Sequence, residues 1–433
     1  MARASGIEPR RAALKVLEDV RGGKPFDSAL REGIGPLPDA DRRLAHELAA
    51  GVLRQRTFLD QQLAPLIPRG WESVSAPLQD ILRLGVYQLT ALERVPSHAA
   101  VDTSVALAKS IGGARAGGFV NAVLRRLTRV DPSISSTTDD TAALAQKYSH
   151  PEWLVRRWVE AFGRDQTEQL LQWNNTRPRL VLQPARQDAE TLAESWRAAG
   201  IQVEPAPYEA GLLTDRSHPA DLPGYSEGGF IVQDPAQALL VRYAQFSSAG
   251  TIYDACAAPG GKTIALGRTA QAVLAGDISR VRARRLAENV VRAGSGREHA
   301  LVADARQPPL RPLGAVLLDA PCSGTGTFAR HPDARWRVSP PALTALQRVQ
   351  RELLEAIAPH VETGGLLVYS TCSLEFEENQ GQVDEFLDRH PEFVREPAAG
   401  VPQSLLSQQG DLLILPQRHG MDGAYAARLR RVA

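Results

Sequence analysis

The sequence predicts an α/β protein with a doubly wound, Rossmann-like domain at its C-terminus, an all-α region at its N-terminus and a small α/β subdomain between them. Beyond Gly250, short apolar runs each end in an acid or a hydroxyl, and helical patterns separate them. Before about residue 130, apolar residues recur only at helical spacing, whereas residues 142–230 mix helical and strand-like runs. Buried parallel strands have this continuous apolar character, and their alternation with helices builds a doubly wound sheet. We expect two to three domains in 433 residues.

The N-terminal region is predicted to be helical throughout. Leu14, Leu17 and Val20 would share one helix face, and Gly22 and Gly23 would end that helix. Further apolar stripes at helical spacing run through residues 44–52 and 119–127. Such stripes are core positions of packed helices.

Polar and mixed segments suggest the domain boundaries. Residues 131–140 are polar and turn-rich and predict a linker. A helical run at 153–162, a strand-like run at 180–183 and a helical run at 192–199 predict the small α/β subdomain. The expected divisions are a helical domain at 1–130, a linker at 131–145, the small subdomain at 146–235 and the Rossmann-like domain at 236–433.

Composition indicates a globular protein of a reducing compartment. Hydrophobic residues make up 43% and charged residues 23% of the chain, no apolar run is long enough for a membrane helix, and the first residues lack a signal segment. Cys256, Cys322 and Cys372 are too few and too scattered for a disulfide framework or a zinc site, so we expect no metal. We therefore expect a cytoplasmic protein without a membrane partner.

Net charge alone does not identify a nucleic-acid partner. The formal charge is +1, but arginines cluster within residues 280–285, 330–337 and 428–431. Each cluster is either a solvated helix face or a contact surface for nucleic acid, and the sequence leaves both interpretations open.

Acidic residues end most of the predicted strands of the Rossmann-like domain. Ligands of doubly wound sheets bind at the carboxyl ends of the strands. We therefore expect these acids to form a row at one edge of the sheet. The predicted strands are 251–254, ending in Asp254; 272–277, ending in Asp277; 301–304, ending in Asp304; 315–319, ending in Asp319; and 366–370, ending in Ser370.

A glycine-rich loop after the first of these strands is the candidate cofactor site. Gly260 and Gly261 would let backbone N–H groups approach a ligand closely where the next helix begins. A phosphate-binding loop could end in Gly261, Lys262 and Thr263. That motif needs a glycine at the position of Cys256, which argues against an ATPase. A dinucleotide fingerprint is excluded because G-x-G-x-x-G is absent.

The remaining interpretation is a methyltransferase loop for S-adenosylmethionine. Asp277 could accept hydrogen bonds from two ribose hydroxyls, and Asp304 could accept one from the adenine amino group. A bare turn between strand and helix is the alternative, and the acids in register argue against it. The loop residues expected to line the pocket are Cys256, Ala257, Ala258, Pro259, Gly260, Gly261 and Lys262.

Two cysteines and an aspartate supply the residue types for methylating cytosine at carbon 5. Carbon 5 is a poor nucleophile until a thiolate adds to carbon 6, and afterwards its proton must leave and the thiolate must be expelled. Such chemistry needs a reactive cysteine, an acid at the polar edge of the ring and a group that handles protons. Asp319 and Cys322 follow the fourth predicted strand and Cys372 follows the fifth. As isolated residues these cysteines would be small buried hydrophobes, but their position at the edge that carries the cofactor loop favours catalysis.

The motifs at 254–262, 319–326 and 370–373 resemble those of RNA 5-methylcytosine methyltransferases. Within that group the chain is similar to the bacterial RsmB/Fmu (Sun) ribosomal enzymes, and the resemblance covers nearly its whole length. Those enzymes carry a NusB-type, RNA-binding helical domain at the N-terminus, and residues 101–127 look like its final helices. The resemblance also implies that the small subdomain is RRM-like.

The resemblance implies a role for each motif residue and a substrate. Loop 256–262 would line the S-adenosylmethionine pocket, with Asp277 on the ribose and Asp304 on the adenine. Asp319 would lie between cofactor and cytosine, Cys372 would be the nucleophile and Cys322 would assist product release. The substrate would be a cytosine of 16S ribosomal RNA, methylated before the subunit is fully assembled, by a monomer that takes no DNA.

Two segments depart from the family pattern, and both are expected to lie outside the chemistry. Residues 421–426 replace a pattern usually written with two adjacent aromatics, and residues 180–183 stand where the family tends to have Arg-Val-Asn. They leave the substrate nucleotide open, with transfer RNA or another ribosomal RNA as alternatives.

Two rival functions remain. A DNA cytosine methyltransferase would use Cys322 as its nucleophile, leave Cys372 without a role and need a large DNA-reading domain for which too little chain follows Cys372. A non-catalytic RNA-binding assembly factor would be favoured by loss of Cys372 or of the glycine loop, and both are intact.

Overall fold

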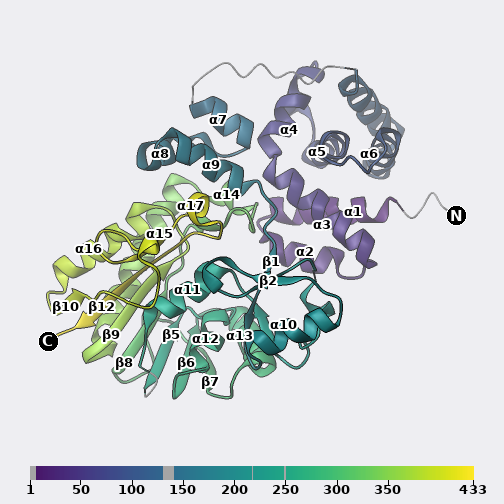
Figure 1. The fold of residues 1–433 in the computed structure, drawn as a ribbon. Coiled ribbons are helices and arrows are strands. Elements are labelled where there is room, and N and C mark those ends of the chain that lie inside the picture. The colour runs from purple at the N-terminus through teal and green to yellow at the C-terminus, as the bar shows by residue number, and fades with distance from the viewer. Residues whose placement is uncertain (1–5, 130–140, 217, 248–249) are drawn as a thin grey trace. The chain divides into compact units, whose positions relative to one another are not determined.

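The structure is a computed structural model of the chain that describes residues 6–129, 141–216, 218–247 and 250–433. The chain forms two compact units (Figure 1). Unit 1 consists of Met1–Thr176 with Phe328–Arg337, and unit 2 of Arg177–Thr327 with Val338–Ala433. Within the described ranges, every helix is too short or too polar to span a lipid bilayer.

Unit 1 is helical, as predicted for the N-terminal region. The predicted face of Leu14 and Leu17 is buried in its main core, and the first helix ends at Arg21, where the N–H of Gly22 donates to the carbonyl of Glu18 at 2.9 Å. A later helix bends at Gly113, whose φ of +65° suits glycine. The helices are α1 (Glu8–Arg21), α2 (Phe26–Ile34), α3 (Asp39–Arg54), α4 (Arg56–Leu63), α5 (Ala76–Ala91), α6 (Ser97–Leu127), α7 (Thr141–Tyr148), α8 (Glu152–Phe162), α9 (Arg164–Asn174) and α14 (Ala334–Arg337).

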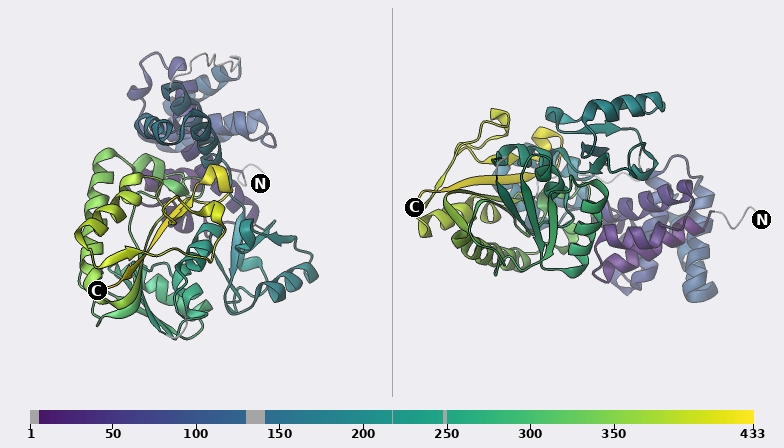
Figure 2. Two further views of the ribbon diagram at one scale, coloured as in Figure 1. Left: turned by 60° about the vertical axis from the view of Figure 1, so that its left-hand side comes forward. Right: turned by 90° about the horizontal axis from the view of Figure 1, so that it is seen from below.

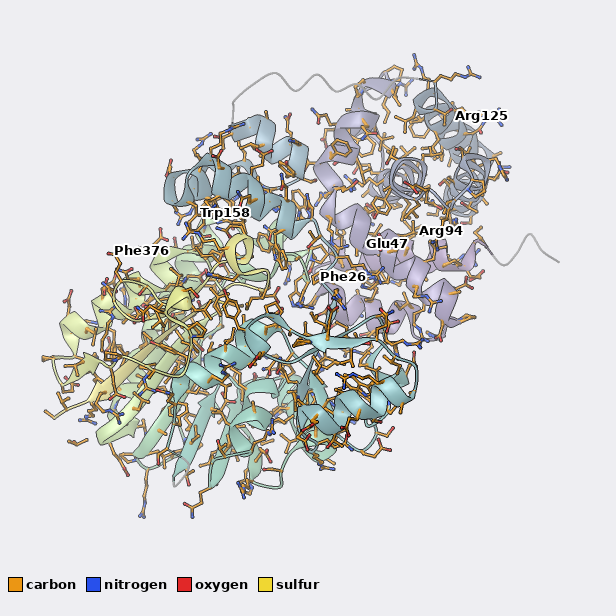
Figure 3. The ribbon with its side chains drawn as sticks, viewed as in Figure 1. Phe26, Glu47, Arg94, Arg125, Trp158 and Phe376 are labelled. Atoms are coloured by element: carbon orange, nitrogen blue, oxygen red, sulfur yellow. The ribbon has the colours of Figure 1, made fainter. Side chains whose placement is uncertain are left out.

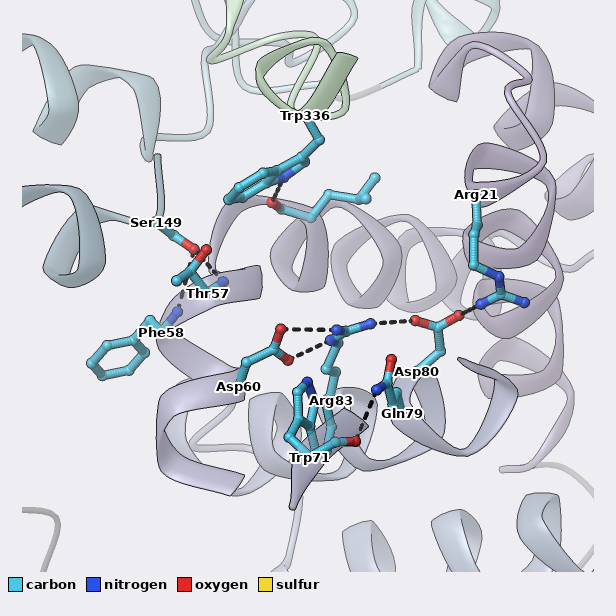
Figure 4. Close-up of polar contacts among 11 residues, drawn as sticks. Arg21, Thr57, Phe58, Asp60, Trp71, Gln79, Asp80, Arg83, Ser149 and Trp336 are labelled. Atoms are coloured by element: carbon cyan, nitrogen blue, oxygen red, sulfur yellow. Dashed lines mark hydrogen bonds and ion pairs between the residues drawn. The ribbon is translucent and has the colours of Figure 1, made fainter. Parts of the chain in front are cut away.

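The expected linker is described only in part. Residues 130–140 lie outside the described residues, whereas residues 141–145 form the start of α7. Helices α7 to α9 lie within unit 1. The physical reason is a cap: the Ser149 hydroxyl accepts from the N–H groups of Thr57 at 2.6 Å and Phe58 at 3.4 Å, in the first turn of α4 (Figure 4).

A partly buried ion-pair network joins the first, fourth and fifth helices of unit 1. The Arg83 guanidinium donates to both carboxylate oxygens of Asp60, at 2.6 and 2.8 Å, and to Asp80 at 2.8 Å (Figure 4). Arg21 from α1 pairs with the other oxygen of Asp80. Burial opposes the charge, but the carboxylates raise the pKa of Arg83 above its usual value. The network therefore fixes the relative positions of α1, α4 and α5.

The segment Phe328–Arg337 comes from the C-terminal half of the chain but folds into unit 1. The indole of Trp336 donates to the carbonyl of Leu53 at 2.8 Å (Figure 4). The guanidinium of Arg335, which is fully buried, donates to the carbonyl of Asn174 and to the side-chain oxygen of Asn175, both at 2.7 Å. It also reaches the carbonyl oxygen of Ser149 at 3.3 Å. Arg335 thus connects the segment to the turn between α7 and α8 and to the end of α9.

Replacing Arg335 with methionine is expected to destabilise unit 1 by about 3–5 kcal/mol. Methionine fills part of the space but leaves several buried carbonyl oxygens without donors. Urea denaturation followed by tryptophan fluorescence would measure the loss. The matched control is Arg156→Met on α8, because Arg156 and its partner Glu152 are both exposed, so its loss is expected to cost less than about 1 kcal/mol. Equal destabilisation by both variants would contradict this account.

Unit 2 contains a small antiparallel sheet with a helix packed against it, which is the combination expected for the small α/β subdomain. Its strand order is β2-β3-β1-β4, and all three pairings are antiparallel. Leu192 and Trp196 of helix α10 pack against this sheet on Leu182 and Phe230. Its elements are β1 (Leu180–Pro184), α10 (Ala189–Ala198), β2 (Val203–Pro205), β3 (Leu212–Thr214) and β4 (Phe230–Val232).

The large sheet of unit 2 is doubly wound. Its order is β10-β12-β9-β8-β5-β6-β7, with β5 to β9 parallel and β11 paired with β12. The chain crosses from one side of β5 to the other between β7 and β8, so the topological switch point lies between β5 and β8. The strands are β5 (Thr251–Ala255), β6 (Ala272–Asp277), β7 (Glu298–Val302), β8 (Leu313–Asp319), β9 (Val361–Thr371), β10 (Phe393–Arg395), β11 (Leu412–Ile414) and β12 (Ala424–Arg431).

Helices cover both faces of this sheet (Figure 2). On one face, Leu239 of α11 packs with Val273 and Leu317; on the other, Leu354 of α15 packs with Val316. Alternate residues along each strand therefore enter different cores, and only the strand ends are left for ligands. The helices are α11 (Pro235–Ala244), α12 (Gly261–Gly267), α13 (Arg280–Ala293), α15 (Pro340–Ile357), α16 (Gln380–Arg389) and α17 (Pro416–His419).

Candidate active site

The glycine-rich loop connects β5 to α12 and has the backbone of a tight ligand-binding turn. Cys256 has a φ of +61° and Gly260 a φ of +104°. A Cβ atom at Gly260 would lie 2.7 Å from a methyl carbon of Leu286, so the close approach of α13 also requires glycine there. Burial raises the pKa of the Cys256 thiol to about 12, and Asp319 and Asp277 add to this shift. Cys256 is therefore a neutral thiol in the loop, not a nucleophile.

Asp277 is a buried carboxylate with one oxygen that has no donor. It ends β6 and is only 1% exposed. Its Oδ1 atom accepts from the N–H of Ser279 at 2.8 Å and from Arg282 at 3.2 Å. Its Oδ2 atom is buried and has no hydrogen-bond donor in the structure. A buried carboxylate oxygen without a donor is costly unless a ligand supplies one, so this atom fits a hydroxyl of a bound cofactor.

Asp304 lies near the same edge but not at the end of a strand, contrary to the prediction. Strand β7 ends at Val302, two residues earlier. The Asp304 carboxylate accepts from the N–H of Arg306 at 2.9 Å and from its guanidinium at 2.8 Å, which closes a turn and ends the strand. The hydrogen bond from Arg306 lowers the pKa of Asp304, so it is ionised at neutral pH. Arg306 donates to both carboxylate oxygens, so a ligand at Asp304 would share them with this arginine.

Asp254 and Thr263 link the strand to the helix that follows the loop. The Thr263 hydroxyl donates to Oδ2 of Asp254 at 2.6 Å. Burial raises the pKa of Asp254 to about 7, against the opposing effect of that hydrogen bond. Asp254 thus connects β5 to α12, the two elements that flank the loop.

Lys262, Asp319 and Ser370 form a polar chain across the ends of α12, β8 and β9. The Lys262 ammonium donates to Oδ2 of Asp319 at 2.8 Å, and the Ser370 hydroxyl donates to Oδ1 at 2.9 Å. Burial alone would lower the pKa of Lys262, but Asp319 raises it above its usual value, and Cys372 adds to the effect. Lys262 therefore remains a cation, and it interacts electrostatically with both Asp319 and Cys372.

The structure brings the two predicted catalytic cysteines together. The Sγ atoms of Cys322 and Cys372 lie 3.4 Å apart without a disulfide, and the backbone N–H of Cys372 points at Sγ of Cys322 at 3.4 Å. The contact with Cys372, together with burial, raises the pKa of the Cys322 thiol well above its usual value. Cys322 therefore keeps its proton at neutral pH, and Cys372 can accept a hydrogen bond from it.

The C-terminal segment 421–426 contacts the site, contrary to the expectation that it lies outside the chemistry. Gly326, in the Cys322 loop, donates its N–H to the carbonyl of Cys372 at 3.0 Å and accepts from the N–H of Gly423 at 2.8 Å. A Cβ atom on Gly326 would lie 2.7 Å from Cα of Gly423. Glycine is required where these three loops meet.

Sequence reasoning missed two buried residues that bond to the cysteine loops, Glu378 and Asn379. Their side chains contact Ser323 and Ser373, the residues that follow the two cysteines. The available signal was an acid–amide pair six and seven residues after Cys372, and nothing in its local spacing distinguished it from a solvated turn.

The fold and the loop place the chain in a class. A doubly wound sheet with its glycine loop at the switch strand and a buried acceptor at the end of the next strand defines a Rossmann-like, S-adenosylmethionine-dependent methyltransferase. Comparison with known proteins supports this class and identifies a particular family within it. The family described as 16S rRNA methyltransferase RsmB/F matches residues 244–430, the NusB family matches 7–129, and the ferredoxin-like domain of the RsmF/B-like methyltransferases matches 150–220.

Relatives match over nearly the full length. A probable ribosomal RNA small subunit methyltransferase B of Synechocystis is 35% identical, over 98% of this chain and all of its own. The ribosomal RNA small subunit methyltransferase B of Pseudomonas syringae is 32% identical, over 99% and 98%. The crystal structure of PH0851 superposes with a TM-score of 0.82 at 25% identity, over 97% and 98% of the two chains. The chain belongs to the 16S rRNA methyltransferase RsmB/F family.

Proposed function

We propose that this protein transfers a methyl group to carbon 5 of a cytosine in 16S ribosomal RNA, through a covalent bond between Cys372 and carbon 6. The observation that carries the proposal is the pair of thiols 3.4 Å apart beside the Lys262–Asp319 ion pair, at the edge where the cofactor loop lies. The relatives are named for the small ribosomal subunit. A ribosomal substrate implies a cytoplasmic location, and we propose that a monomer acts before the subunit is fully assembled.

In this mechanism, bound S-adenosylmethionine supplies an electrophilic methyl group. The thiolate of Cys372 forms a bond to carbon 6, which is favoured by the nearby Lys262 cation. Carbon 5 then attacks the methyl group, whose bond to the cofactor's sulfur breaks. Carbon 5 next gives its proton to solvent, and the electron pair of that C–H bond reforms the ring double bond as the bond to Cys372 breaks and its sulfur returns to thiolate. Asp319 holds the polar edge of the cytosine, and Cys322, the protonated thiol, assists the release.

The experiment that tests the function is bisulfite mapping after methyl transfer in vitro. Purified protein and cofactor are incubated separately with 16S ribosomal RNA, 23S ribosomal RNA and transfer RNA. We expect one cytosine of 16S ribosomal RNA to become resistant to bisulfite, and the other RNAs to remain unchanged. Modification only of another RNA would correct the substrate, whereas labelled RNA without a resistant cytosine would overturn the chemistry. Assembled small subunits as a fourth substrate would test the timing.

Cofactor affinity is expected to depend on Asp277. Asp277→Ala removes the buried acceptor proposed to bind the ribose, so calorimetric titration should show binding weaker by roughly 1.5–3 kcal/mol, about 10- to 150-fold. The matched control is Glu288→Ala on α13, since Glu288 is exposed and paired only with Arg284. Unchanged affinity in Asp277→Ala would mean that the pocket lies elsewhere.

The helical N-terminal domain is expected to bind or position RNA without catalysing. Arg125, Arg126 and Arg129 are exposed near the end of α6. Arg125 is labelled in Figure 3. Changing all three to glutamine should reduce the salt dependence of RNA affinity by about two in the log–log slope, because phosphate contacts release counterions.

The control for this prediction neutralises three arginines of unit 2. Arg348, Arg351 and Arg389 each pair with a glutamate, so their replacement should leave the slope nearly unchanged. The triple variant of α6 could retain the full salt dependence of RNA affinity while the unit 2 variant loses it. In that case the helical domain has a function other than binding RNA.

A further inference from the structure

Glu378 and Asn379 are consecutive buried residues, and each holds one of the two cysteine loops. They lie where the short turn Phe376–Glu378 meets α16, with 0% and 4% of their surface exposed. The neighbouring Phe376 is exposed (Figure 3). Glu378 and Asn379 are therefore buried although they are polar, while the aromatic Phe376 is exposed, which is the reverse of an ordinary surface turn.

Glu378 holds the Cys322 loop. Its Oε1 atom accepts from the backbone N–H of Ser323 at 2.9 Å and from the Gln350 amide at 2.9 Å, and its Oε2 atom accepts from the Ser323 hydroxyl. The same Gln350 amide donates to the carbonyl of Pro321 at 2.9 Å. The residues on both sides of Cys322 are therefore fixed by one buried carboxylate and the amide that it orients.

Asn379 holds the Cys372 loop in the same way. Its amide nitrogen donates to the carbonyl of Ser373 at 2.9 Å, and its oxygen accepts from the Thr371 hydroxyl. The residues on both sides of Cys372 are thereby fixed. The hydroxyls of Ser323 and Ser373 also lie 3.1 Å apart, so the two loops are joined to each other.

We propose that Glu378 and Asn379 are positioning residues that set the separation and orientation of the two cysteines, Glu378 through the Cys322 loop and Asn379 through the Cys372 loop. The inference rests on the proposed function. Reacting groups must be held within a fraction of an ångström, and a displacement of about 1 Å can cost 100-fold in rate. Charge-assisted bonds to a buried carboxylate supply that rigidity to a loop that would otherwise move.

The charge of Glu378 adds a second effect that a purely structural residue would lack. Cys322 is faced by Cys372, Glu378 and the buried phenol of Tyr369. Asp319 precedes it on the same loop, and Lys262 lies beyond Asp319. The contact with Cys372 is the largest influence on the pKa of the Cys322 thiol, and the negative charge of Glu378 raises it further. Removing that charge should therefore make Cys322 ionise at lower pH.

The first test is Glu378→Gln, which keeps the size of the side chain but removes its charge and places an amide donor against the donors of Ser323 and Gln350. Alkylation by iodoacetamide is followed for each cysteine by peptide mass spectrometry across pH. We expect the midpoint for Cys322 to fall to lower pH, and turnover to fall about 10- to 100-fold with cofactor affinity unchanged. Glu377→Gln, the same change one residue earlier, should show neither effect.

The second test is Asn379→Asp, which keeps the acceptor for Thr371 but loses the donor to Ser373. In a Cys322→Ala background it should slow formation of the covalent protein–RNA complex about 10-fold or more, while cofactor affinity stays the same. Wild-type thiol profiles in Glu378→Gln together with wild-type complex formation in Asn379→Asp would overturn the proposal. The alkylation profile needs no methyl transfer, so it separates a failure of this proposal from a failure of the proposed function.

Discussion

Replacing Cys372 with alanine is expected to reduce methyl transfer by about 10⁴-fold or more and to leave no covalent protein–RNA complex. Without the thiolate, carbon 5 of the cytosine is never activated, so the cofactor's methyl group has no acceptor. The measurement is transfer of labelled methyl groups to RNA together with a denaturing gel. Cofactor affinity measured on the same sample should be unchanged, because Cys372 lies on the β9 loop and not on the cofactor loop.

The companion variant Cys322→Ala should fail at a later step. It should attack and methylate, then stall while still bonded to the RNA, because the protonated thiol 3.4 Å from Cys372 is missing when the product must leave. A slowly migrating, labelled protein–RNA band is therefore expected for Cys322→Ala. The double variant Cys322→Ala/Cys372→Ala is the control and should give no band.

Two outcomes would contradict these assignments. A stalled band in Cys372→Ala instead would reverse the roles of the cysteines. Cys322 would then be the nucleophile, as expected for a DNA cytosine methyltransferase. Full activity in both single variants would show that covalent catalysis by these residues is wrong.

Asp319→Ala is expected to lower kcat/KM about 100- to 1,000-fold. The carboxylate is proposed to hold the polar edge of the cytosine, and its loss would also leave the buried Lys262 ammonium without its partner. Each oxygen of Asp319 accepts one bond in the structure, from Lys262 or Ser370, and retains a lone pair for the substrate. Single-turnover methyl transfer at saturating cofactor would measure the effect on the chemical step.

The control for Asp319 is Ser370→Ala, which removes one neutral hydrogen bond to the same carboxylate. Its effect should stay within about 10-fold, since such a bond contributes about 1 kcal/mol. If Asp319→Ala and Ser370→Ala were equally mild, the acid would not contact the cytosine, and the orientation of the base would have to come from another group.

Much of the candidate site could be predicted because its determinants are local. Apolar runs mark buried parallel strands, and the carboxyl ends of such strands share one edge. That logic alone placed Asp277, Asp319 and the two cysteines together, and it also placed the glycine loop. It was wrong in detail for Asp304, because the turn closed by Arg306 ends β7 at Val302.

The sequence by itself therefore determined the class of fold and the edge of the sheet at which the predicted site residues lie. Only the tertiary structure decided how those residues are held. Glu378 bonds to Ser323 across 55 positions, and Arg335 bonds to Asn175 across 160. Gly423 likewise meets Gly326 only because β12 pairs with β9. The physical reason is that periodicity encodes which face of an element is buried, whereas the partner of a buried polar group depends on which distant segments the folded chain brings beside it.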